Sequence, residues 1–193
     1  MNNIFAKKEL ERLLEGNKHF INGNCSCTKR NLETLHKYAH GQEPKTIVLS
    51  CSDSRIIPEL IFDCGIGELF VVRTAGGTAG ISNDIVESVE FAITKFQSPL
   101  LLLIGHDDCG AVQYAKEHFC EVDVRFNSII ASLAPILADN EDAHHDEITI
   151  AHTQELKKVL LNRSEIIATA VKKNELEIVC AHFKFDTGEV VIV

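Results

Sequence analysis

The sequence lacks a long apolar run, and it lacks an excess of basic residues. Its longest apolar stretch, "PLLLLIG" at 99–105, is far shorter than the ~20 residues that a membrane-spanning helix needs. We therefore expect no membrane association. The 28 Asp and Glu outnumber the 19 Lys and Arg, which leaves a formal net charge of −9. Such a chain repels polyanions, so nucleic acid and anionic membrane surfaces are not expected as partners.

Other absences concern organisation and location. The chain has no internal repeat, no low-complexity tract and no linker rich in proline or serine. Its 193 residues are enough for one compact domain with a substantial core and few for two, so a single domain over 1–193 is expected. The N-terminal segment carries scattered charges and no apolar stretch of the kind that a secretory signal needs. The sequence therefore predicts a cytoplasmic protein.

Seven cysteines are many for a reducing compartment. Their number is odd and their spacing shows no framework of the small secreted kind, so metal binding or catalysis is the better use for some of them. Cys25 and Cys27, in "NCSCTK", admit a redox pair or a second metal site, but a plain surface role is favoured because no partner ligand lies nearby. Cys64, Cys120 and Cys180 lie in apolar stretches and are predicted to be packing residues.

Two kinds of hydrophobic pattern alternate along the chain. Short apolar runs rich in β-branched or bulky residues predict strands buried on both faces. They lie at 45–51, 67–75, 99–106 and 176–185, and a turn with a last edge strand follows at 185–193. Helical periodicity is found near the N-terminus and at 82–96, 124–138 and 146–173. Strands separated by helices imply right-handed crossovers. The predicted fold class is therefore α/β, with a mostly parallel central sheet flanked by helices and a closing antiparallel C-terminal edge strand.

Two of the helical segments carry further local signals. The segment 82–96 has an apolar stripe on one face, and Ser82 or Asn83 can cap its start. The N-terminal segment has a smaller stripe of leucines, which Gly16 and Asn17 interrupt.

Polar clusters follow two of the predicted strands. "CSDSR" at 51–55 comes directly after "KTIVLS", and "GHDDCGA" at 105–111 comes after "PLLLLI". Ligands of open parallel sheets bind beyond the carboxyl ends of the strands, near the place where strand order reverses. If the two strands are neighbours, Cys51, His106 and Cys109 come together. Two thiolates and an imidazole are a ligand set that suits zinc, and the three residues together favour a metal site over unrelated core residues.

Asp53 and Arg55 indicate a catalytic site rather than a structural one. A structural zinc site closes its shell with a fourth cysteine or histidine, whereas a catalytic site keeps one position for water. Here the nearest candidate for that position is the carboxylate of Asp53, which Arg55 can hold in a bidentate salt bridge. We expect a switch in which water takes the fourth position when Asp53 is on Arg55, and Asp53 blocks it when the carboxylate is on the metal.

The pattern C-x-D-S-R, followed about fifty residues later by G-H-x-x-C-G, resembles the signature of the β-class carbonic anhydrases. The likeness covers most of the chain, from "LLEGNKHFINGN" through "GELFVVRTAGG" to "FKFDTGEV". It implies one Zn²⁺ per subunit on Cys51, His106 and Cys109, with Asp53 as an exchangeable fourth metal ligand and Arg55 as its partner. The β-carbonic anhydrase fold is implied as well.

The resemblance also implies an activity and an assembly. The chain would be a lyase, a carbonate dehydratase that hydrates CO2 reversibly to bicarbonate and a proton by a zinc-bound hydroxide. Asp53, held by Arg55, would orient that hydroxide, so both are predicted catalytic residues. Because two thiolates make the site less electropositive than three histidines, activity is expected to rise with alkaline pH. The expected assembly is a homodimer or homotetramer in which 1–40 is a helical arm that packs on a partner subunit.

The chain departs from the family's usual pattern in two places. Thr74 and Gly77, in "RTAGG", stand where asparagines are usual. Asp107 and Asp108 follow His106, where one small polar residue and then a variable one is usual, and they add negative charge close to the metal position.

Some questions stay open at this stage. His118, Tyr114 and His182 are candidate proton relays by residue type alone, and none is assigned. The same fold could act on another linear heterocumulene, carbonyl sulfide or carbon disulfide, because a zinc hydroxide attacks these carbons as well. A non-catalytic zinc protein, structural or sensory, would instead keep Asp53 on the metal.

Overall fold

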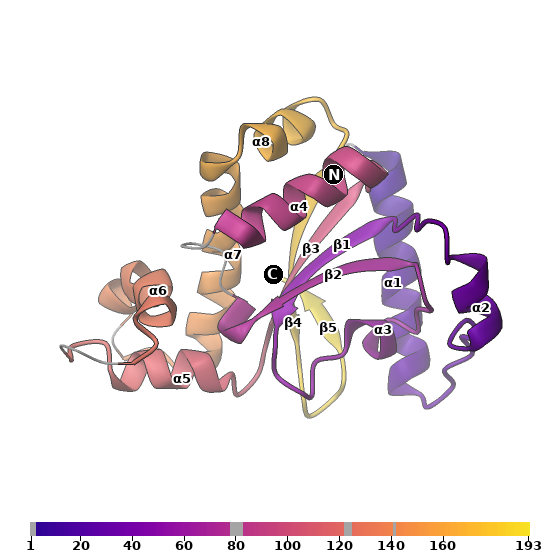
Figure 1. Cartoon of the computed structure of the whole chain (residues 1–193). Helices are drawn as coiled ribbons and strands as arrows, with labels where there is room; N and C mark the ends of the chain where they lie inside the picture. The colour runs from indigo at the N-terminus through magenta and orange to yellow at the C-terminus, as the bar shows by residue number, and fades with distance from the viewer. Residues whose placement is uncertain (1–2, 78–82, 122–124, 141) are drawn as a thin grey trace.

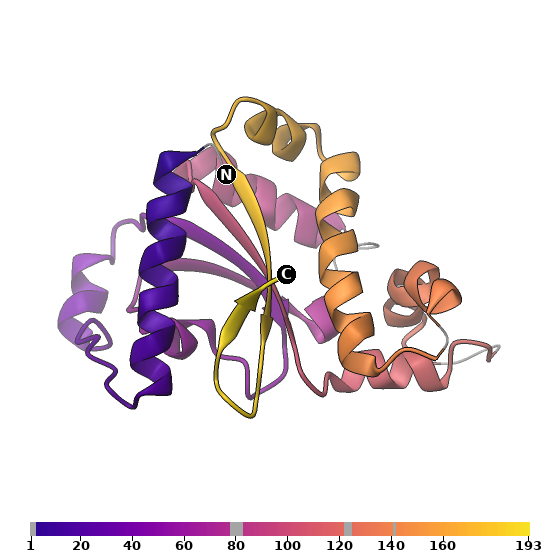
Figure 2. The same cartoon turned by 180° about the vertical axis from the view of Figure 1, so that it is seen from behind.

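The computed structural model of the chain describes residues 3–77, 83–121, 125–140 and 142–193. Within these ranges the chain forms a sheet of five strands with helices on both faces (Figures 1 and 2). The strands are β1 Thr46–Cys51, β2 Leu69–Thr74, β3 Leu100–His106, β4 Glu177–Phe183 and β5 Val190–Ile192. Their order is β2-β1-β3-β4-β5, and β5 alone runs antiparallel to its neighbour. The predicted fold class is confirmed.

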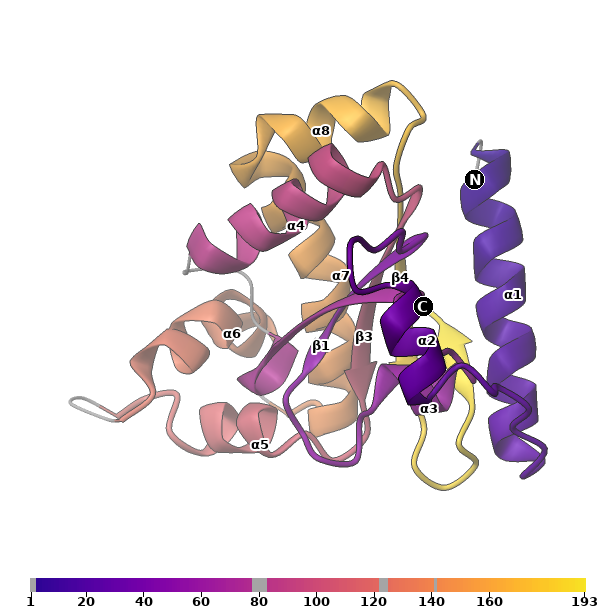
Figure 3. The ribbon, with the colours of Figure 1, turned by 45° about the vertical axis from the view of Figure 1, so that its right-hand side comes forward.

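The helices cover the two faces of the sheet unequally. They are α1 Ile4–Ile21, α2 Leu32–Lys37, α3 Pro58–Ile61, α4 Asn83–Phe96, α5 Gly110–Glu117, α6 Asn127–Asp139, α7 His145–Arg163 and α8 Glu165–Lys172, with a short 3-10 turn, η1, at Ala75–Gly77. Figure 3 shows α1 on one side of the sheet and α4, α7 and α8 on the other. Among the described helices, none combines the length and the apolarity that crossing a bilayer requires.

Alternate residues of the strands feed two separate cores, because successive side chains of a strand point to opposite faces. Val48 and Leu102 pack in the core beneath α1 and α3. Leu49 and Leu103 pack in the core beneath α4, α7 and α8. Burial on both faces explains why these strands read as continuous apolar runs rather than as alternating ones.

The strand order fixes where a ligand can bind. The chain passes from β1 outward to β2 and then returns to the other side of β1 to form β3. Strand order therefore reverses between β1 and β3, and the crevice beyond their carboxyl ends is the expected ligand position of such a sheet. The turns that follow Cys51 and His106 lie at this place.

Gly16 and Asn17 lie inside α1, and the predicted interruption there is wrong. A Cβ at Gly16 would collide with the carbonyl oxygen of Phe62, so glycine allows α1 to approach α3 closely. The Asn17 side chain donates to the carbonyl of Gly188 at 2.9 Å and accepts from the N–H of Val190 at 2.9 Å. Gly16 and Asn17 are thus explained by contacts of α1 with other segments, and neither residue breaks the helix.

The segment 146–173 forms two helices rather than the predicted one. Ser164 ends α7 and begins α8, with an extended backbone (φ −125°, ψ 113°). Its hydroxyl accepts from the N–H of Ile167 at 3.0 Å, which caps α8 and lets the chain change direction. In the segment 124–138, residue 124 lies outside the described residues and the helix begins at Asn127. The proposed cap Ser82 also lies outside them.

Candidate metal centre

Three side chains of metal-ligand type meet at the carboxyl ends of β1 and β3. Cys51 ends β1, His106 ends β3, and Cys109 is the N-cap residue of α5. Their ligand atoms all lie within 4.8 Å of one another, and the Sγ atoms of Cys51 and Cys109 are 4.0 Å apart. That separation is about twice a disulfide bond, so the sulfurs are neighbours without being linked. The predicted convergence of these three residues is therefore observed.

The ring of His106 is held in one orientation and has one nitrogen to spare. Its Nδ1 lies 2.7 Å from the carbonyl oxygen of Asp107. Its Nε2 is buried and, among the described residues, has no hydrogen-bond partner. A buried imidazole whose first nitrogen is fixed by a carbonyl, while the second is unpaired, matches the way histidines are prepared to ligate metals. The donor set and this orphaned nitrogen fit a zinc ion.

The two thiols influence each other's ionisation. The Cys109 thiol, the ring of His106 and the N–H groups of Asp53 and Gly76 hold the pKa of Cys51 well below its usual range, against the opposing effect of burial. The two N–H groups each lie 3.3 Å from the Cys51 sulfur. The Cys51 thiolate and burial in turn raise the pKa of Cys109. Two thiolates this close repel each other, and a cation bound between them would stabilise the ionised form of both.

The turn after β2 supplies one of these N–H donors. Gly76 and Gly77 both have left-handed backbones (φ 72° and 64°), which favour glycine. Gly77 packs against the backbone of β1, where a Cβ would lie 3.6 Å from the carbonyl carbon of Ser50. The glycine at this departure from the family pattern thus has a backbone role, and the turn places the N–H of Gly76 toward the Cys51 sulfur.

Asp53 is paired with Arg55 in this structure. The Arg55 Nε and one terminal nitrogen lie 2.9 and 2.7 Å from the two carboxylate oxygens, and the backbone N–H of Arg55 also donates at 2.9 Å. These hydrogen bonds lower the pKa of Asp53 to about 2. Arg73, to which sequence reasoning gave no role, donates to the carbonyls of Cys51 and Asp53 at 3.1 and 2.7 Å. Arg73 therefore fixes the backbone between Cys51 and Asp53. Its place in the segment "RTAGG" was the feature of the sequence that could have pointed to this role.

Comparison with known proteins identifies the family. A family model described as "Carbonic anhydrase" matches residues 46–190. Carbonic anhydrase 2 of Mycobacterium tuberculosis is 32% identical over 186 residues, which cover 93% of this chain and 89% of that protein. The chain belongs to the β-carbonic anhydrase family. This membership confirms the predicted family and the predicted enzyme type, a carbonic anhydrase.

Further relatives and solved structures agree. A carbonic anhydrase of Mycolicibacterium smegmatis is 32% identical over 184 residues, covering 92% of this chain and 88% of that protein. A Coccomyxa β-carbonic anhydrase, solved in complex with acetazolamide, superposes with a TM-score of 0.71 at 21% identity, over 95% of this chain and 86% of that one. A structure from a study of two tetrameric β-carbonic anhydrases of Sordaria macrospora gives 0.69 at 22% identity, over 96% and 97%. The fold is thus that of the β-carbonic anhydrases.

The two aspartates that depart from the family pattern point in different directions. Asp107 turns to β4, where its carboxylate lies 2.7 Å from Nε2 of His182 and accepts the N–H of Phe185 at 2.9 Å. Burial raises the pKa of Asp107, but these partners lower it overall. Asp108 turns to α7, where its carboxylate lies 2.9 Å from Nε2 of His145. Both negative charges therefore have polar partners of their own beside the metal-type ligands.

The relay candidates differ in their surroundings. His182 is engaged with Asp107. On α5 the rings of Tyr114 and His118 stack with their centroids 4.2 Å apart, and His118 pairs with Glu121 at 2.9 Å. None of these contacts links a candidate to the metal-type ligands, so no relay is assigned.

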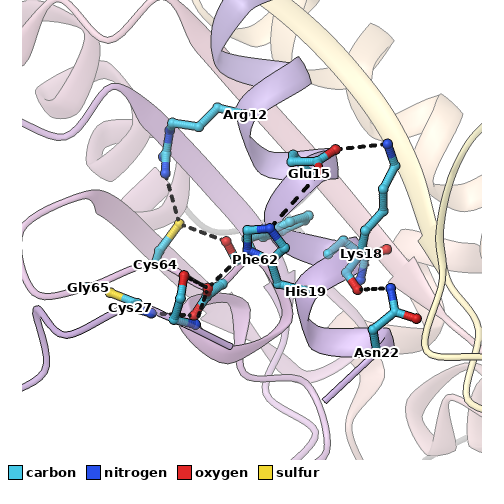
Figure 4. Close-up of polar contacts among 12 residues, drawn as sticks. Arg12, Glu15, Lys18, His19, Asn22, Cys27, Phe62, Cys64 and Gly65 are labelled. Carbon is cyan, nitrogen blue, oxygen red and sulfur yellow. Dashed lines mark hydrogen bonds and ion pairs between the residues drawn. The ribbon is translucent and has the colours of Figure 1, made fainter. Parts of the chain in front are cut away.

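The other cysteines fall into three groups. Cys64 is fully buried, donating to the carbonyl of Phe62 at 3.4 Å and lying 3.6 Å from the Arg12 guanidinium (Figure 4). Cys180 is also buried, as predicted, whereas Cys120 is exposed, so its predicted packing role is wrong. Cys120 comes just after α5, which ends at Glu117.

Cys25 and Cys27 join no metal-type cluster among the residues that the structure describes. The backbone N–H of Cys27 instead donates to the carboxylate of Asp63 at 3.1 Å. This contact ties the segment after α1 to the end of α3, which agrees with the plain surface role that was favoured for the pair.

A second cluster of metal-type side chains lies at the start of α7. The ligand atoms of His144, His145 and Asp146 also lie within 4.8 Å of one another, but these residues are exposed or half-buried. His144 is the N-cap and forms a capping box with Glu147. The Asp146 carboxylate accepts the N–H of Asp108 at 2.9 Å. The cluster is occupied with capping the helix and holding the neighbouring loop.

Proposed function

We propose that the chain is a zinc-dependent carbonate dehydratase that hydrates CO2 reversibly to bicarbonate and a proton. Family and fold support CO2 hydration. The observation that carries the proposal is the unpaired Nε2 of His106, buried beside two cysteine sulfurs at the strand ends where ligands bind.

Cys51, His106 and Cys109 would hold one Zn²⁺ per subunit, with Asp53 as an exchangeable fourth ligand. Two thiolates and an imidazole suit this borderline-soft ion, which imposes no geometry of its own. When bound, zinc supplies a Lewis acid that lowers the pKa of water far enough for hydroxide to be available near neutral pH.

Asp53 and Arg55 would act on the reacting water. With a pKa of about 2, Asp53 stays ionised at neutral pH and can only accept hydrogen bonds. The pairing with Arg55 fixes its carboxylate, so that a remaining lone pair can accept a hydrogen bond from the water and orient it toward CO2. Held in this way, the carboxylate also leaves the fourth ligand position free.

One side of the site is closed by apolar packing. Cys51 and Cys109 belong to a buried cluster that also contains Val112, Ala115 and Leu133, which are fully buried. These side chains keep bulk water from the inner side of the two sulfurs. CO2, with bicarbonate as product, is proposed as the substrate because of the family.

The test is zinc content and CO2 hydration measured on the same purified protein. We expect about one zinc per chain and hydration well above the uncatalysed rate. Asp53→Asn keeps the size of the side chain but removes its charge, and it should keep zinc while lowering turnover by roughly 10² or more. A zinc-loaded wild type without turnover from pH 6.5 to about pH 9 would indicate a non-catalytic zinc protein. Faster turnover of carbonyl sulfide than of CO2 would indicate the related hydrolase.

We further propose a homodimer or homotetramer. β2 lies at the edge of the sheet, and an unpaired edge invites pairing with another chain. Beside it, Phe91 is 54% exposed and stacks edge-on against Phe96. Relatives from Sordaria macrospora are described as tetrameric. Sedimentation of the zinc-loaded protein should give at least a dimer, and Phe91→Glu should weaken it.

The arm at 1–40 is part of the same proposal. Several of its large apolar side chains are exposed in the single chain, although α1 buries Leu13 and partly buries Leu10, Leu14 and Phe20 against its own sheet. The exposed ones are Ile4, Phe5, Ile21, Leu32 and Leu35. A partner subunit would cover them. The single domain over 1–193 and the cytoplasmic location stay predictions.

A further inference from the structure

The Arg55 guanidinium is held by more than Asp53. One of its terminal nitrogens also donates to the carbonyl oxygen of Asp108 at 3.2 Å. The ring of Phe185 lies against the guanidinium, with its centroid 4.2 Å from the central carbon. This distance is well within the range of a cation–π contact, and arginine planes stack on aromatic faces.

Phe185 is itself fixed by Asp107. The backbone N–H of Phe185 donates to the Asp107 carboxylate at 2.9 Å, and the N–H of Asp107 donates to the carbonyl of Phe183 at 3.1 Å. The other carboxylate oxygen lies 2.7 Å from His182, which is 3% exposed. The segment that follows β4 is therefore tied to the end of β3. The centroid of the Phe185 ring also lies 5.3 Å from that of the His106 ring, so Phe185 contacts both a metal-type ligand and Arg55.

We propose that Phe185, fixed by Asp107, is a positioning residue that holds Arg55 in place and thereby keeps Asp53 turned away from the metal position. This inference rests on the proposed function, because it concerns the fourth ligand position of the same site. Asp107 is one of the residues at which the chain departs from its family's pattern, and it contacts neither Asp53 nor Arg55 in any described hydrogen bond.

The Asp53–Arg55 pair needs such support. The Arg55 side chain is 51% exposed, and ion pairs that are exposed to water contribute little by themselves. A metal ion offers the carboxylate a strong alternative partner. An aromatic face that orients the guanidinium shifts this balance toward the Arg55-bound state, by about three- to tenfold for a partly exposed contact.

The first experiment measures how freely an added anion reaches the metal. The protein is loaded with Co²⁺, a coloured ion that accepts the same ligands, and azide binding is followed by visible absorption. In Phe185→Leu, Asp53 competes for the metal more often, so azide should bind more weakly, by at most the change of about three- to tenfold in the Asp53 equilibrium. Phe185→Tyr keeps the ring and should keep the azide affinity. Phe126→Leu removes a ring that packs on Tyr114 and serves as the control.

A double-variant cycle shows whether the effect passes through Asp53. In the Asp53→Ala background no carboxylate competes, so Phe185→Leu should leave the azide affinity unchanged. A loss of the same size in that background would overturn the inference, because the ring would then act on the site by another route.

The second experiment uses no activity and no azide. In the ¹⁵N-labelled zinc-loaded protein, hydrogen exchange at Nε of Arg55 reports how firmly the guanidinium is held. We expect exchange to be about three- to tenfold faster in Phe185→Leu and unchanged in Phe185→Tyr. Unchanged exchange and azide affinity in Phe185→Leu would overturn the inference. If Phe185→Leu differs from the wild type in this way but the zinc-loaded wild type hydrates no CO2, the proposed function is contradicted and the positioning role of Phe185 stands.

Discussion

Among the described residues, two regions gather side chains that metals bind, and they differ in their surroundings. Cys51 and His106 are buried at the ends of β1 and β3, and Cys109 is buried at the start of α5. His144 and His145 lie with Asp146 at the start of α7, where solvent reaches them. In both regions the ligand atoms lie within 4.8 Å of one another, so proximity alone does not distinguish them.

The difference lies in what the ligand atoms already do. His106 has a buried nitrogen without a partner among the described residues, whereas the nitrogens and oxygens of the second cluster face carboxylates, backbone N–H groups or water. A buried ligand atom without a hydrogen-bond partner is therefore a better indicator of a metal centre than proximity alone.

A third region shows that a buried, unpaired nitrogen does not by itself make a metal site. His152 on α7 is 2% exposed, and within the described parts of the chain neither of its ring nitrogens has a hydrogen-bond partner. It belongs to no group of metal-type ligands there. Burial lowers the pKa of this ring to about 4. His152 is thus a neutral core residue, and its effect should appear in stability rather than in metal binding.

The largest expected effect comes from removing one sulfur of the buried trio. Cys109→Ser should lower zinc content to well below one per chain and reduce CO2 hydration by more than about 100-fold, since loss of even an outer hydrogen-bond partner of a metal ligand costs about 10- to 100-fold. Cys180→Ser changes another buried cysteine, which packs in a different cluster, and should keep both zinc and activity. Full zinc content and activity in Cys109→Ser would show that the buried trio is no more a metal centre than the cluster at the start of α7.

A middle-sized effect is expected from His152→Leu in acid. Above pH 6.5 the ring is neutral in the folded and unfolded chain, so it adds no pH dependence. As the pH falls from 6.5 toward about 4, the unfolded chain binds a proton that the folded one excludes, and stability is lost. Between pH 8 and pH 4.5 this amounts to about 2–3 kcal/mol, which the variant should not lose.

Urea unfolding at both pH values measures this difference. A chelator is present throughout, so that the loss of zinc in acid does not contribute. Equal pH dependence in wild type and variant would show that His152 is not held neutral by burial.

The smallest effect is expected in the exposed cluster. His145→Ala removes the contact with Asp108, an exposed pair worth about 0–1 kcal/mol. Zinc per chain should not change, and CO2 hydration should stay within about twofold. A fall in bound metal, measured by elemental analysis, would make the start of α7 a second metal site and would break the comparison.

The sequence was most informative where local pattern and topology agree. Apolar runs buried on both faces predicted the parallel strands, and the polar residues after two of them predicted the positions of Cys51, His106 and Cys109. The pairing of Asp53 with Arg55 was also foreseeable, because the two residues are close in the chain.

What the sequence could not reveal depends on contacts between distant segments. Gly16 suggested a helix break, yet its role is the close approach of α1 to Phe62. Phe185 lies far along the chain from Arg55, and no periodicity brings them together. The sequence also does not show that ring nitrogens of His106 and His152 are buried without a hydrogen-bond partner among the described residues, because this depends on what packs around each ring.

Two cysteines and one histidine would bind a single zinc ion and leave one ligand position for water. X-ray absorption at the zinc edge of the purified, zinc-loaded protein measures this ligand set. We expect two sulfur ligands, one imidazole and one further light atom around each zinc, and one sulfur fewer around the zinc that Cys51→Ser retains. A shell of four sulfurs, or one without sulfur, would rule out this ligand set.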